Sequence, residues 1–305
     1  MPSPATAPET SEDDPRLGRW LARQRNADGA RVVVVGFPSD EGVRRNGGRP
    51  GAADGPAAIR EALYKLTPDA EHPQRFGHLL DQTADLGDVR VTGDVEGDQE
   101  RLGAVLGPLL EANTIPVVLG GGHETTYGHF LGYVAARRDT AVLNWDAHLD
   151  VRAVGEAGGH SGSPFRQALE HPSGRCRRYV AAGLQPHGVA ATHLTYVRQR
   201  GGRCVWRGDL DTARVGDLVG GLTGSTLATF DLDAVEAAAA PGVSAPNPSG
   251  LPVDVWLRAA YGCGRSLRVG SMDVVELNPR FDVDSRTARL AALTVWWFLK
   301  GVADR

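Results

Sequence analysis

The stretch TAVLNWDAHLD, residues 140–150, combines the two features that decide the fold of this chain. Its first half is mostly apolar, which is typical of a strand buried on both faces of a parallel sheet. Its second half places Asp146, His148 and Asp150 directly after that run. Alternate side chains of an extended strand point to the same face, so this spacing predicts that the three polar groups converge.

The same arrangement occurs twice more. GGGHE (120–124) follows the apolar run IPVVL, and TFDLD (229–233) ends a run that begins near residue 225. In open α/β sheets, ligands bind in the crevice beyond the carboxyl ends of the strands. The three segments therefore predict a metal site with six ligands, which are His123, Asp146, His148, Asp150, Asp231 and Asp233.

The types of ligand narrow the choice of metal. Imidazole and carboxylate groups without thiolates suit a hard or borderline ion such as Mn²⁺. Four buried aspartates are costly unless cations neutralise them, and two divalent ions supply that charge and can hold a hydroxide nucleophile. Taken alone, a histidine after a glycine-rich turn is more often a helix cap or a core group, so the prediction depends on the coincidence of all six residues.

Apolar runs and helical patterns alternate along the rest of the chain. The strand-like runs are 31–38, 115–121, 140–147, 177–185, 203–207, 225–233 and 266–275, and helical patterns cover 55–66, 98–113, 125–138 and 284–303. This alternation predicts the α/β class, with a parallel sheet covered by helices on both faces. We expect a disordered tail over 1–15, a short amphipathic helix within 16–26, and one domain over 16–305.

Composition excludes several classes of function. A formal charge of −4 and a pI near 6.1 disfavour nucleic acid as a partner, which leaves a small-molecule substrate. The three cysteines are far apart, which argues against a disulfide framework and favours a reducing cytoplasm. The N-terminal residues lack the pattern of a secretory signal, and no apolar run has membrane-spanning length, so no membrane partner is expected.

The segments GGGHE, NWDAHLD and TFDLDAVEAAAAPGVSAPNPSGL resemble those of the ureohydrolase family, which includes arginase, agmatinase and formimidoylglutamase. The resemblance implies a three-layer α/β/α fold with a mostly parallel sheet of about eight strands. It also implies two Mn²⁺ ions per subunit and a homo-oligomer, either a trimer or a hexamer. One ion would be held by His123, Asp146, Asp150 and Asp231, and the other by Asp146, His148, Asp231 and Asp233.

Three further segments resemble the formimidoylglutamase branch, and they are 40–63, SGSPFRQAL (161–169) and 272–292. Arginase-like and agmatinase-like members carry a histidine where this chain has Ser161. His160 stands one position earlier, and either shuttles a proton or only lines the loop. The branch implies hydrolysis of N-formimidoyl-L-glutamate to L-glutamate and formamide in histidine degradation, with a metal-bridging hydroxide as the nucleophile.

Several residues are candidates for contacts with such a substrate. The resemblance assigns Glu276 to the amidinium group, although its carboxylate could instead accept hydrogen bonds from the turn that follows. Protonation of the leaving amine needs a donor, which is either Asp150 or a water held by His160. For the substrate tail, the candidates are Arg45, Asn46, Ser161 and Arg166, since arginine binds carboxylates in bidentate geometry.

Other functions remain open at the level of sequence. An agmatinase or a guanidino-acid hydrolase would use the same metals but release urea, and Ser161 disfavours it. A non-catalytic relative would be expected to lose ligands, whereas all six are present. A deacylase with one zinc ion would not need both bridging aspartates.

Overall fold

A single parallel sheet forms the centre of the protein. The computed structural model describes residues 11, 13–24 and 26–305. Its strands are β1 (Val32–Phe37), β2 (Thr83–Asp88), β3 (Ile115–Gly120), β4 (Thr140–Trp145), β5 (Cys176–Leu184), β6 (Arg203–Trp206), β7 (Thr226–Asp231) and β8 (Val269–Val275). They lie in the order β2-β1-β3-β8-β7-β4-β5-β6, and every neighbouring pair is parallel. The predicted α/β class with a parallel sheet of eight strands is confirmed.

Most of the strands are predominantly apolar because both faces of the sheet are covered. In β1, Val32 and Val34 belong to the core on one face, whereas Val33 and Val35 belong to the core on the other. This is the period of two that a pleated strand imposes. Two apolar cores on opposite faces therefore make a three-layer structure.

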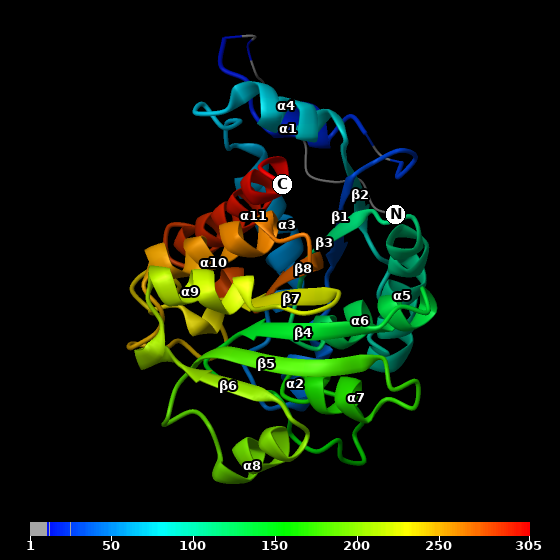
Figure 1. The fold of residues 1–305 in the computed structure, drawn as a ribbon, viewed down its shortest axis with the longest axis vertical. Helices are drawn as coiled ribbons and strands as arrows, with labels where there is room; N and C mark the ends of the chain where they lie inside the picture. Colours follow the sequence, from blue (N-terminus) through cyan, green and yellow to red (C-terminus); the bar gives the residue numbers. More distant parts are fainter. Residues whose placement is uncertain (1–10, 12, 25) are drawn as a thin grey trace.

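The helices divide between these two faces (Figure 1). They are α1 (Gly18–Leu21), α2 (Glu41–Arg45), α3 (Gly55–Tyr64), α4 (Pro73–Asp81), α5 (Val95–Glu111), α6 (Thr125–Ala135), α7 (Pro164–Glu170), α8 (Ala191–Gln199), α9 (Thr212–Gly220), α10 (Val253–Arg265) and α11 (Arg286–Ala303). Helices α3, α9, α10 and α11 pack on one face, and α5, α6 and α7 on the other. No helix in the described ranges is long and apolar enough to cross a membrane.

The structure differs from the sequence-based prediction at two places. Strand β2 was not predicted, since TADLGD carries two aspartates and a glycine. The helix expected within 16–26 is limited to the four residues of α1. Of the expected disordered tail, 1–15, the structure describes only residues 11 and 13–15, so the tail stays a prediction.

The strand order explains why the ligand segments meet. β3, β8, β7 and β4 are neighbours in the sheet and all point the same way. Their carboxyl ends, at Gly120, Val275, Asp231 and Trp145, therefore lie along one edge. The loops that follow these strands converge there.

Candidate active site

The six predicted metal ligands lie just beyond the ends of β3, β4 and β7. Asp231 is the last residue of β7, and Asp233 lies in the 3₁₀ turn η3 (Leu232–Ala234). The chain bends directly after β4, and Asp150 has a positive φ of 43°. Our reason for expecting Asp146, His148 and Asp150 to converge was therefore wrong, because a bent loop and not an extended strand brings them together.

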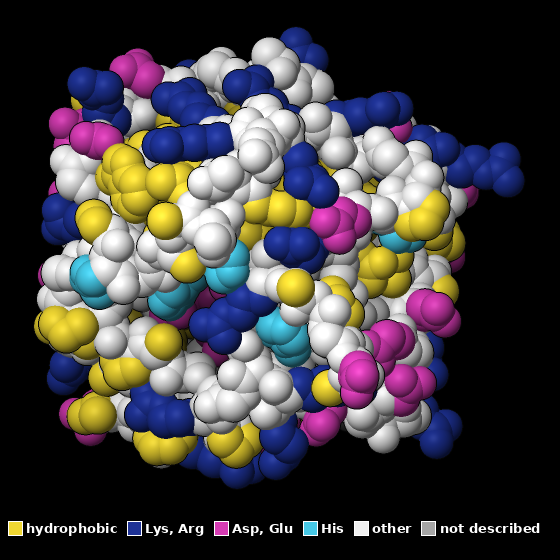
Figure 2. All heavy atoms as spheres, turned by 90° about the horizontal axis from the view of Figure 1, so that it is seen from below, with side chains coloured by type: hydrophobic (Ala, Val, Ile, Leu, Met, Phe, Trp, Pro, Cys, Tyr) yellow, Lys and Arg dark blue, Asp and Glu magenta, His cyan; other side chains and the backbone are white. Residues whose placement is uncertain are grey.

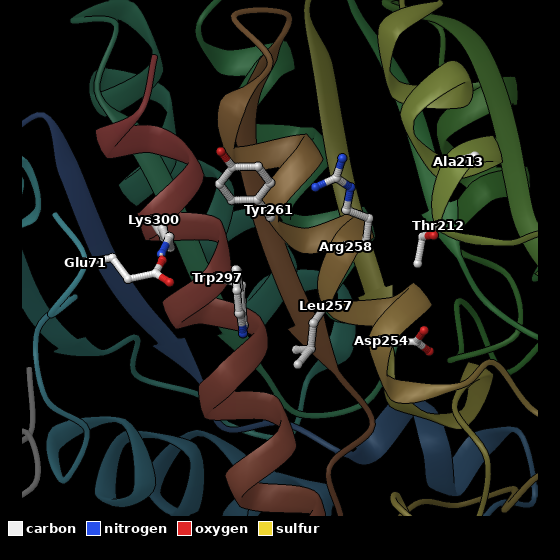
Figure 3. Close-up of a pocket in the computed structure, with 9 residues that line it drawn as sticks. All are labelled: Glu71, Thr212, Ala213, Asp254, Leu257, Arg258, Tyr261, Trp297 and Lys300. Carbon is white, nitrogen blue, oxygen red and sulfur yellow. The ribbon is translucent and has the colours of Figure 1, made fainter.

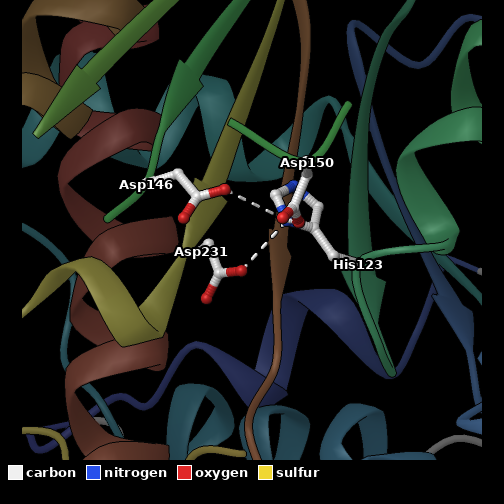
Figure 4. A group of neighbouring side chains, drawn as sticks. All are labelled: His123, Asp146, Asp150 and Asp231. Carbon is white, nitrogen blue, oxygen red and sulfur yellow. Dashed lines mark ion pairs between the residues drawn. The ribbon is translucent and has the colours of Figure 1, made fainter. Parts of the chain in front are cut away.

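Three of these side chains surround a ring nitrogen of a fourth, His123 (Figure 4). The Nδ1 atom of His123 lies 2.9 Å from Asp231 Oδ2, 3.0 Å from Asp150 Oδ2 and 3.5 Å from Asp146 Oδ2. His123 is buried, and within the described residues this nitrogen has no hydrogen-bond partner. A ring nitrogen that faces three carboxylate oxygens needs positive charge, supplied either by its own proton or by a cation bound between them.

A second group shares Asp146 with the first. The Nδ1 atom of His148 lies 3.4 Å from Asp146 Oδ1 and 3.2 Å from Asp233 Oδ2. The other oxygen of Asp233 is buried and receives no hydrogen bond from any residue that the structure describes. Asp146 thus presents one oxygen to each group, which is the arrangement of a bridging carboxylate.

The electrostatics of the two groups indicate the same need for positive charge. Burial, and then the charges of Asp233 and Asp146, raise the pKa of Asp231 well above its usual value. Burial alone would lower the pKa of His123, but Asp150 and Asp231 hold it well above its ordinary value. Divalent ions would provide this charge without protonating the imidazoles, and oxygen and nitrogen donors fit Mn²⁺.

A chain of hydrogen bonds orients the His123 ring through Nε2, the nitrogen that does not face the carboxylates. Its Nε2 atom lies 3.1 Å from Thr229 Oγ1, which lies 3.2 Å from Thr126 Oγ1. Thr126 donates its only proton to the buried carboxylate of Asp273, 3.2 Å away, whose other oxygen is 2.8 Å from His129 Nδ1. Thr229 must therefore donate to Thr126 and accept from Nε2 of His123. This direction leaves the lone pair of His123 on Nδ1, facing the carboxylates.

Two buried glutamates, Glu276 and Glu124, lie beside His123. Glu276, with a positive φ of 70°, accepts a hydrogen bond from the backbone N–H of His123 at 2.8 Å. Burial, and then the charge of Glu124, raises its pKa to about 8. Glu124 accepts from the N–H of Gly42 at 2.9 Å, and burial raises its pKa to about 7. The sequence analysis did not identify Glu124 as a site residue, although its position directly after the predicted ligand His123 could have indicated that it lies near the site.

The glycines of GGGHE have a packing role. A Cβ atom on Gly121 would lie 1.8 Å from the carbonyl oxygen of Ser39. Only a glycine allows the β3 loop to approach the loop after β1 this closely. The run therefore positions His123 and Glu124.

A cavity of about 240 Å³ opens onto these groups. Its lining comprises Asn46, Gly47, Gly48, His148, Asp150, Arg152, Ser161, Asp231, Asp233, Ser244, Ala245 and Glu276. Figure 2 shows one face of the molecule with a hollow in which acidic atoms lie below histidine and basic side chains. Asn46, Ser161 and Glu276 were predicted contacts, whereas Arg152 was not.

The two predicted arginines are engaged within the protein. Arg45 donates to Glu96 at 2.9 Å and to the carbonyl oxygen of Gly159 at 3.1 Å. Arg166 donates to the carbonyl oxygen of Val151 at 2.9 Å. Neither Arg45 nor Arg166 is among the described residues that line the cavity. Both instead brace the loop between β4 and α7.

His160 lies in the same loop. Its Nδ1 atom accepts a hydrogen bond from the N–H of Gly162 at 3.2 Å. Burial lowers its pKa below the ordinary value. His160 is not among the described residues that line the cavity. The negative charge of Asp150 nevertheless reaches it and partly offsets the effect of burial by raising its pKa.

A larger cavity, of about 780 Å³, lies between α9, α10 and α11 (Figure 3). It is lined by Glu71, Thr212, Ala213, Asp254, Leu257, Arg258, Tyr261, Trp297 and Lys300. Its described lining shares no residue with the cavity at the strand ends. Nearby Asp69, Glu71 and His72 form a third acidic group, but Lys300 already pairs with Asp69 at 3.1 Å. The smaller cavity is the candidate site because it holds the reactive groups.

Comparisons with known proteins agree with this geometry. The model of the arginase family matches residues 30–300. The formimidoylglutamase of Chromobacterium violaceum is 38% identical over 278 residues, which cover 87% of this chain and 86% of that protein. The formimidoylglutamase of Nocardia farcinica is 41% identical over 270 residues, with 85% and 83% covered.

A solved structure matches over nearly the whole chain. It is the formiminoglutamase of Trypanosoma cruzi, crystallised with Mn²⁺. The two folds superimpose with a TM-score of 0.88 and 35% sequence identity, covering 96% of this chain and 100% of the other. This structure thus shares the fold of the protein over nearly the full length of both chains.

Proposed function

This chain belongs to the arginase family, and we propose that it hydrolyses the C–N bond of N-formimidoyl-L-glutamate to L-glutamate and formamide, a step of histidine degradation. The relatives named formimidoylglutamase, which match over most of their length, support this substrate. The observation that carries the chemistry is the Nδ1 atom of His123, which faces three carboxylate oxygens at the base of a cavity.

We infer that two Mn²⁺ ions bind per subunit. The first would be held by His123, Asp146, Asp150 and Asp231, which lie together in the structure, and the second by the neighbouring group of Asp146, His148 and Asp233. The family resemblance adds Asp231 to the second set. The separate oxygens of Asp146 support its role as a bridge. Asp231 would be the second bridge. When bound, the ions supply a hydroxide near neutral pH and polarise the amidine carbon.

The remaining groups would hold the substrate and move protons. Glu276 binds the amidinium group through its buried carboxylate, since a carboxylate and a planar cation form a strong directional pair. Asn46 and Ser161 contact the tail, and Arg45 and Arg166 position the loop that carries Ser161. Asp150, or a water held by His160, donates the proton to the leaving amine.

Three broader features of the protein remain predictions. They are a single domain over 16–305, assembly into a trimer or hexamer, and location in the cytoplasm. The resemblance to the family suggests the assembly, and the cysteine usage suggests the location.

An assay of the Mn²⁺-loaded protein tests the proposed function. The substrates are N-formimidoyl-L-glutamate, agmatine, arginine and 4-guanidinobutyrate, with formamide and urea measured separately. We expect formamide from the first compound and little urea from the others. Urea from a guanidino compound, with the formimidoyl compound inert, would refute the substrate. The Asp146→Asn variant is the control for metal-dependent turnover, because it loses a bridging charge.

A further inference from the structure

Tyr179 and Asn144 lie on neighbouring strands and contact the loop that follows β4. Tyr179 of β5 pairs with Val142 of β4, so it points to the same face of the sheet as Asn144, two residues further along β4. Both side chains are buried, and neither belongs to the described lining of the cavity. Any influence that they have on the site must therefore pass through other residues.

A series of hydrogen bonds runs from the Asp146 carboxylate to the backbone of this loop. Asn144 Nδ2 donates to Asp146 Oδ2 at 3.0 Å and to Tyr179 Oη at 3.1 Å. Tyr179 Oη donates its only proton to the carbonyl oxygen of Leu149 at 2.7 Å, so it must accept from Asn144. Both neighbours of the amide are thus acceptors, and only its NH₂ group can face them. This arrangement fixes the oxygen of Asp146 that lies 3.5 Å from His123 Nδ1.

The other end of the series holds the bend of the loop. Asp150 has a positive φ of 43°, in the left-handed region that residues other than glycine rarely adopt. Such a residue persists only where its surroundings fix it. The carbonyl oxygens of both peptide groups that flank its Cα atom are held, that of Leu149 by Tyr179 and that of Asp150 by the N–H of Phe165 at 3.2 Å. The Tyr179 hydroxyl therefore contributes to the position of Asp150.

The ring of Tyr179 is held independently of its hydroxyl. It stacks on Phe165 with the ring centroids 4.8 Å apart and the planes 26° apart. Phe165 in turn makes an edge contact with the ring of His123, with the centroids 5.2 Å apart. A phenylalanine in place of Tyr179 would keep this stack and lose only the hydrogen bonds. The substitution thus isolates the contribution of the hydroxyl.

We propose that Tyr179, acting through Asn144 and Leu149, is a positioning residue for one of the two Mn²⁺ ions, the ion held by the His123 group. The two ligands that it supports, Asp146 through Oδ2 and Asp150, both belong to that group. This inference rests on the proposed function, and it goes further by assigning a buried residue outside the cavity to one ion and not to the other.

The second ion should depend on other bonds. Asp146 Oδ1, which faces the second group, accepts from the backbone N–H of His148 at 2.6 Å. The structure describes His148 and Asp233, and neither receives a hydrogen bond from Tyr179 or Asn144. Loss of the Tyr179 hydroxyl should therefore weaken the first ion and spare the second.

Calorimetric titration of the metal-free protein with Mn²⁺ tests the inference. The wild type should bind two ions. In Tyr179→Phe, the affinity for one ion should fall about 10-fold to 100-fold, the usual effect of losing the support of a metal ligand, and the affinity for the other should stay within about twofold. Asn144→Leu removes the donor to Asp146 and should weaken the same ion. The double variant should lose little more than either single variant, because both changes break one series of bonds.

Electron paramagnetic resonance of the Mn²⁺-loaded proteins provides a second readout. Two ions that share a carboxylate give a spin-coupled signal, whereas a lone ion gives the hyperfine pattern of isolated Mn²⁺. At a Mn²⁺ concentration that just saturates the wild type, Tyr179→Phe should give the isolated pattern. Tyr133→Phe is the matched control and should keep the coupled signal. It removes an equally buried tyrosine hydroxyl, which lies 2.7 Å from Ser271 Oγ and outside the series of bonds to Asp146.

The outcomes separate this inference from the proposed function. Wild-type affinities for both ions in Tyr179→Phe, or an equal fall for both, would overturn the inference, and Asn144→Leu carries the same test if Tyr179→Phe does not fold. A wild type that binds a single ion would refute the proposed pair of ions. In that case, a fall in affinity in Tyr179→Phe but not in Tyr133→Phe would still support Tyr179, and an unchanged affinity would refute its role. A wild type that binds no Mn²⁺ would refute both.

Discussion

At the scale of the residue, the two ring nitrogens of His123 have different partners. Nδ1 faces three carboxylates, and Nε2 contacts Thr229. The hydrogen-bond chain to Asp273 sets the direction of every proton along it. A metal-bound histidine needs this kind of support, since its second nitrogen fixes the orientation of the ring.

The Thr229→Val variant should therefore weaken metal binding, although Thr229 is not itself a metal ligand. We expect the affinity for Mn²⁺ to fall by about 10-fold to 100-fold, the usual effect of losing such support. Calorimetric titration of the metal-free protein measures it, and Thr229→Ser should restore the affinity because it keeps the hydroxyl. Thr226→Val, on the same strand, removes a hydroxyl that contacts only a local carbonyl and is the control. Equal affinities in all four proteins would contradict this role.

The sequence identified some of the site residues and not others. The six proposed metal ligands were found because aspartates and histidines stand out directly after apolar runs. Thr229 and Arg152 have no such contrast, since a threonine is common in strands and an arginine is common on surfaces. What they contact depends on the strand order that places Asp273 beside Thr229, and on the path of the loop that carries Arg152, and the sequence pattern specifies neither.

At the scale of the element, a buried ion pair connects β2 to α3. Arg60 donates to Asp85 at 2.8 Å and to Asp88 at 2.9 Å, and both Arg60 and Asp85 are buried. Breaking a buried pair leaves a charge without compensation, which costs about 3–5 kcal/mol. The position of the edge strand therefore depends on Arg60.

We expect Arg60→Met to lower the free energy of unfolding by about that amount, 3–5 kcal/mol. Urea unfolding of the metal-free protein measures the change. Arg44→Ala is the control, because the exposed pair with Glu41, 3.0 Å apart, should contribute at most about 1 kcal/mol. A loss below 1 kcal/mol in Arg60→Met would show that water reaches Asp85 and stabilises it.

The same pair explains why β2 was not predicted. Strand prediction relies on apolar and β-branched residues, and TADLGD offers few of them. The aspartates of β2 are compensated by an arginine more than twenty residues earlier in the chain. The seven predicted strands could be recognised because apolar side chains from each of them pack in the two cores, even though β8 also buries Asp273.

At the scale of the whole molecule, the metal site should stabilise the fold. The carboxylates of the two groups are buried against one another, and burial and repulsion raise the pKa of Asp231 well above normal. Divalent ions remove this repulsion. They also bind the folded state in preference to the unfolded chain, which shifts the folding equilibrium.

Removal of metal by a chelator should therefore lower the Tm. Addition of Mn²⁺ at a thousandfold excess over its Kd should stabilise the protein by about 4 kcal/mol, visible as a rise of several degrees in Tm by calorimetry. The Asp146→Asn variant should show little of this rise. A Tm that does not respond to Mn²⁺ in the wild type would argue against a buried metal site.

The order of the strands has a consequence for the synthesis of the protein. The site groups follow β3, β4, β7 and β8 along the chain, but in the sheet β8 lies between β3 and β7. A nascent chain that ends before residue 269 leaves a gap between the strand that carries His123 and the strand that carries Asp231. Parallel pairing over such separations is slow and non-local. An ion can thus be captured only after nearly the whole polypeptide has left the ribosome, so a loaded metal marks a molecule that has completed folding.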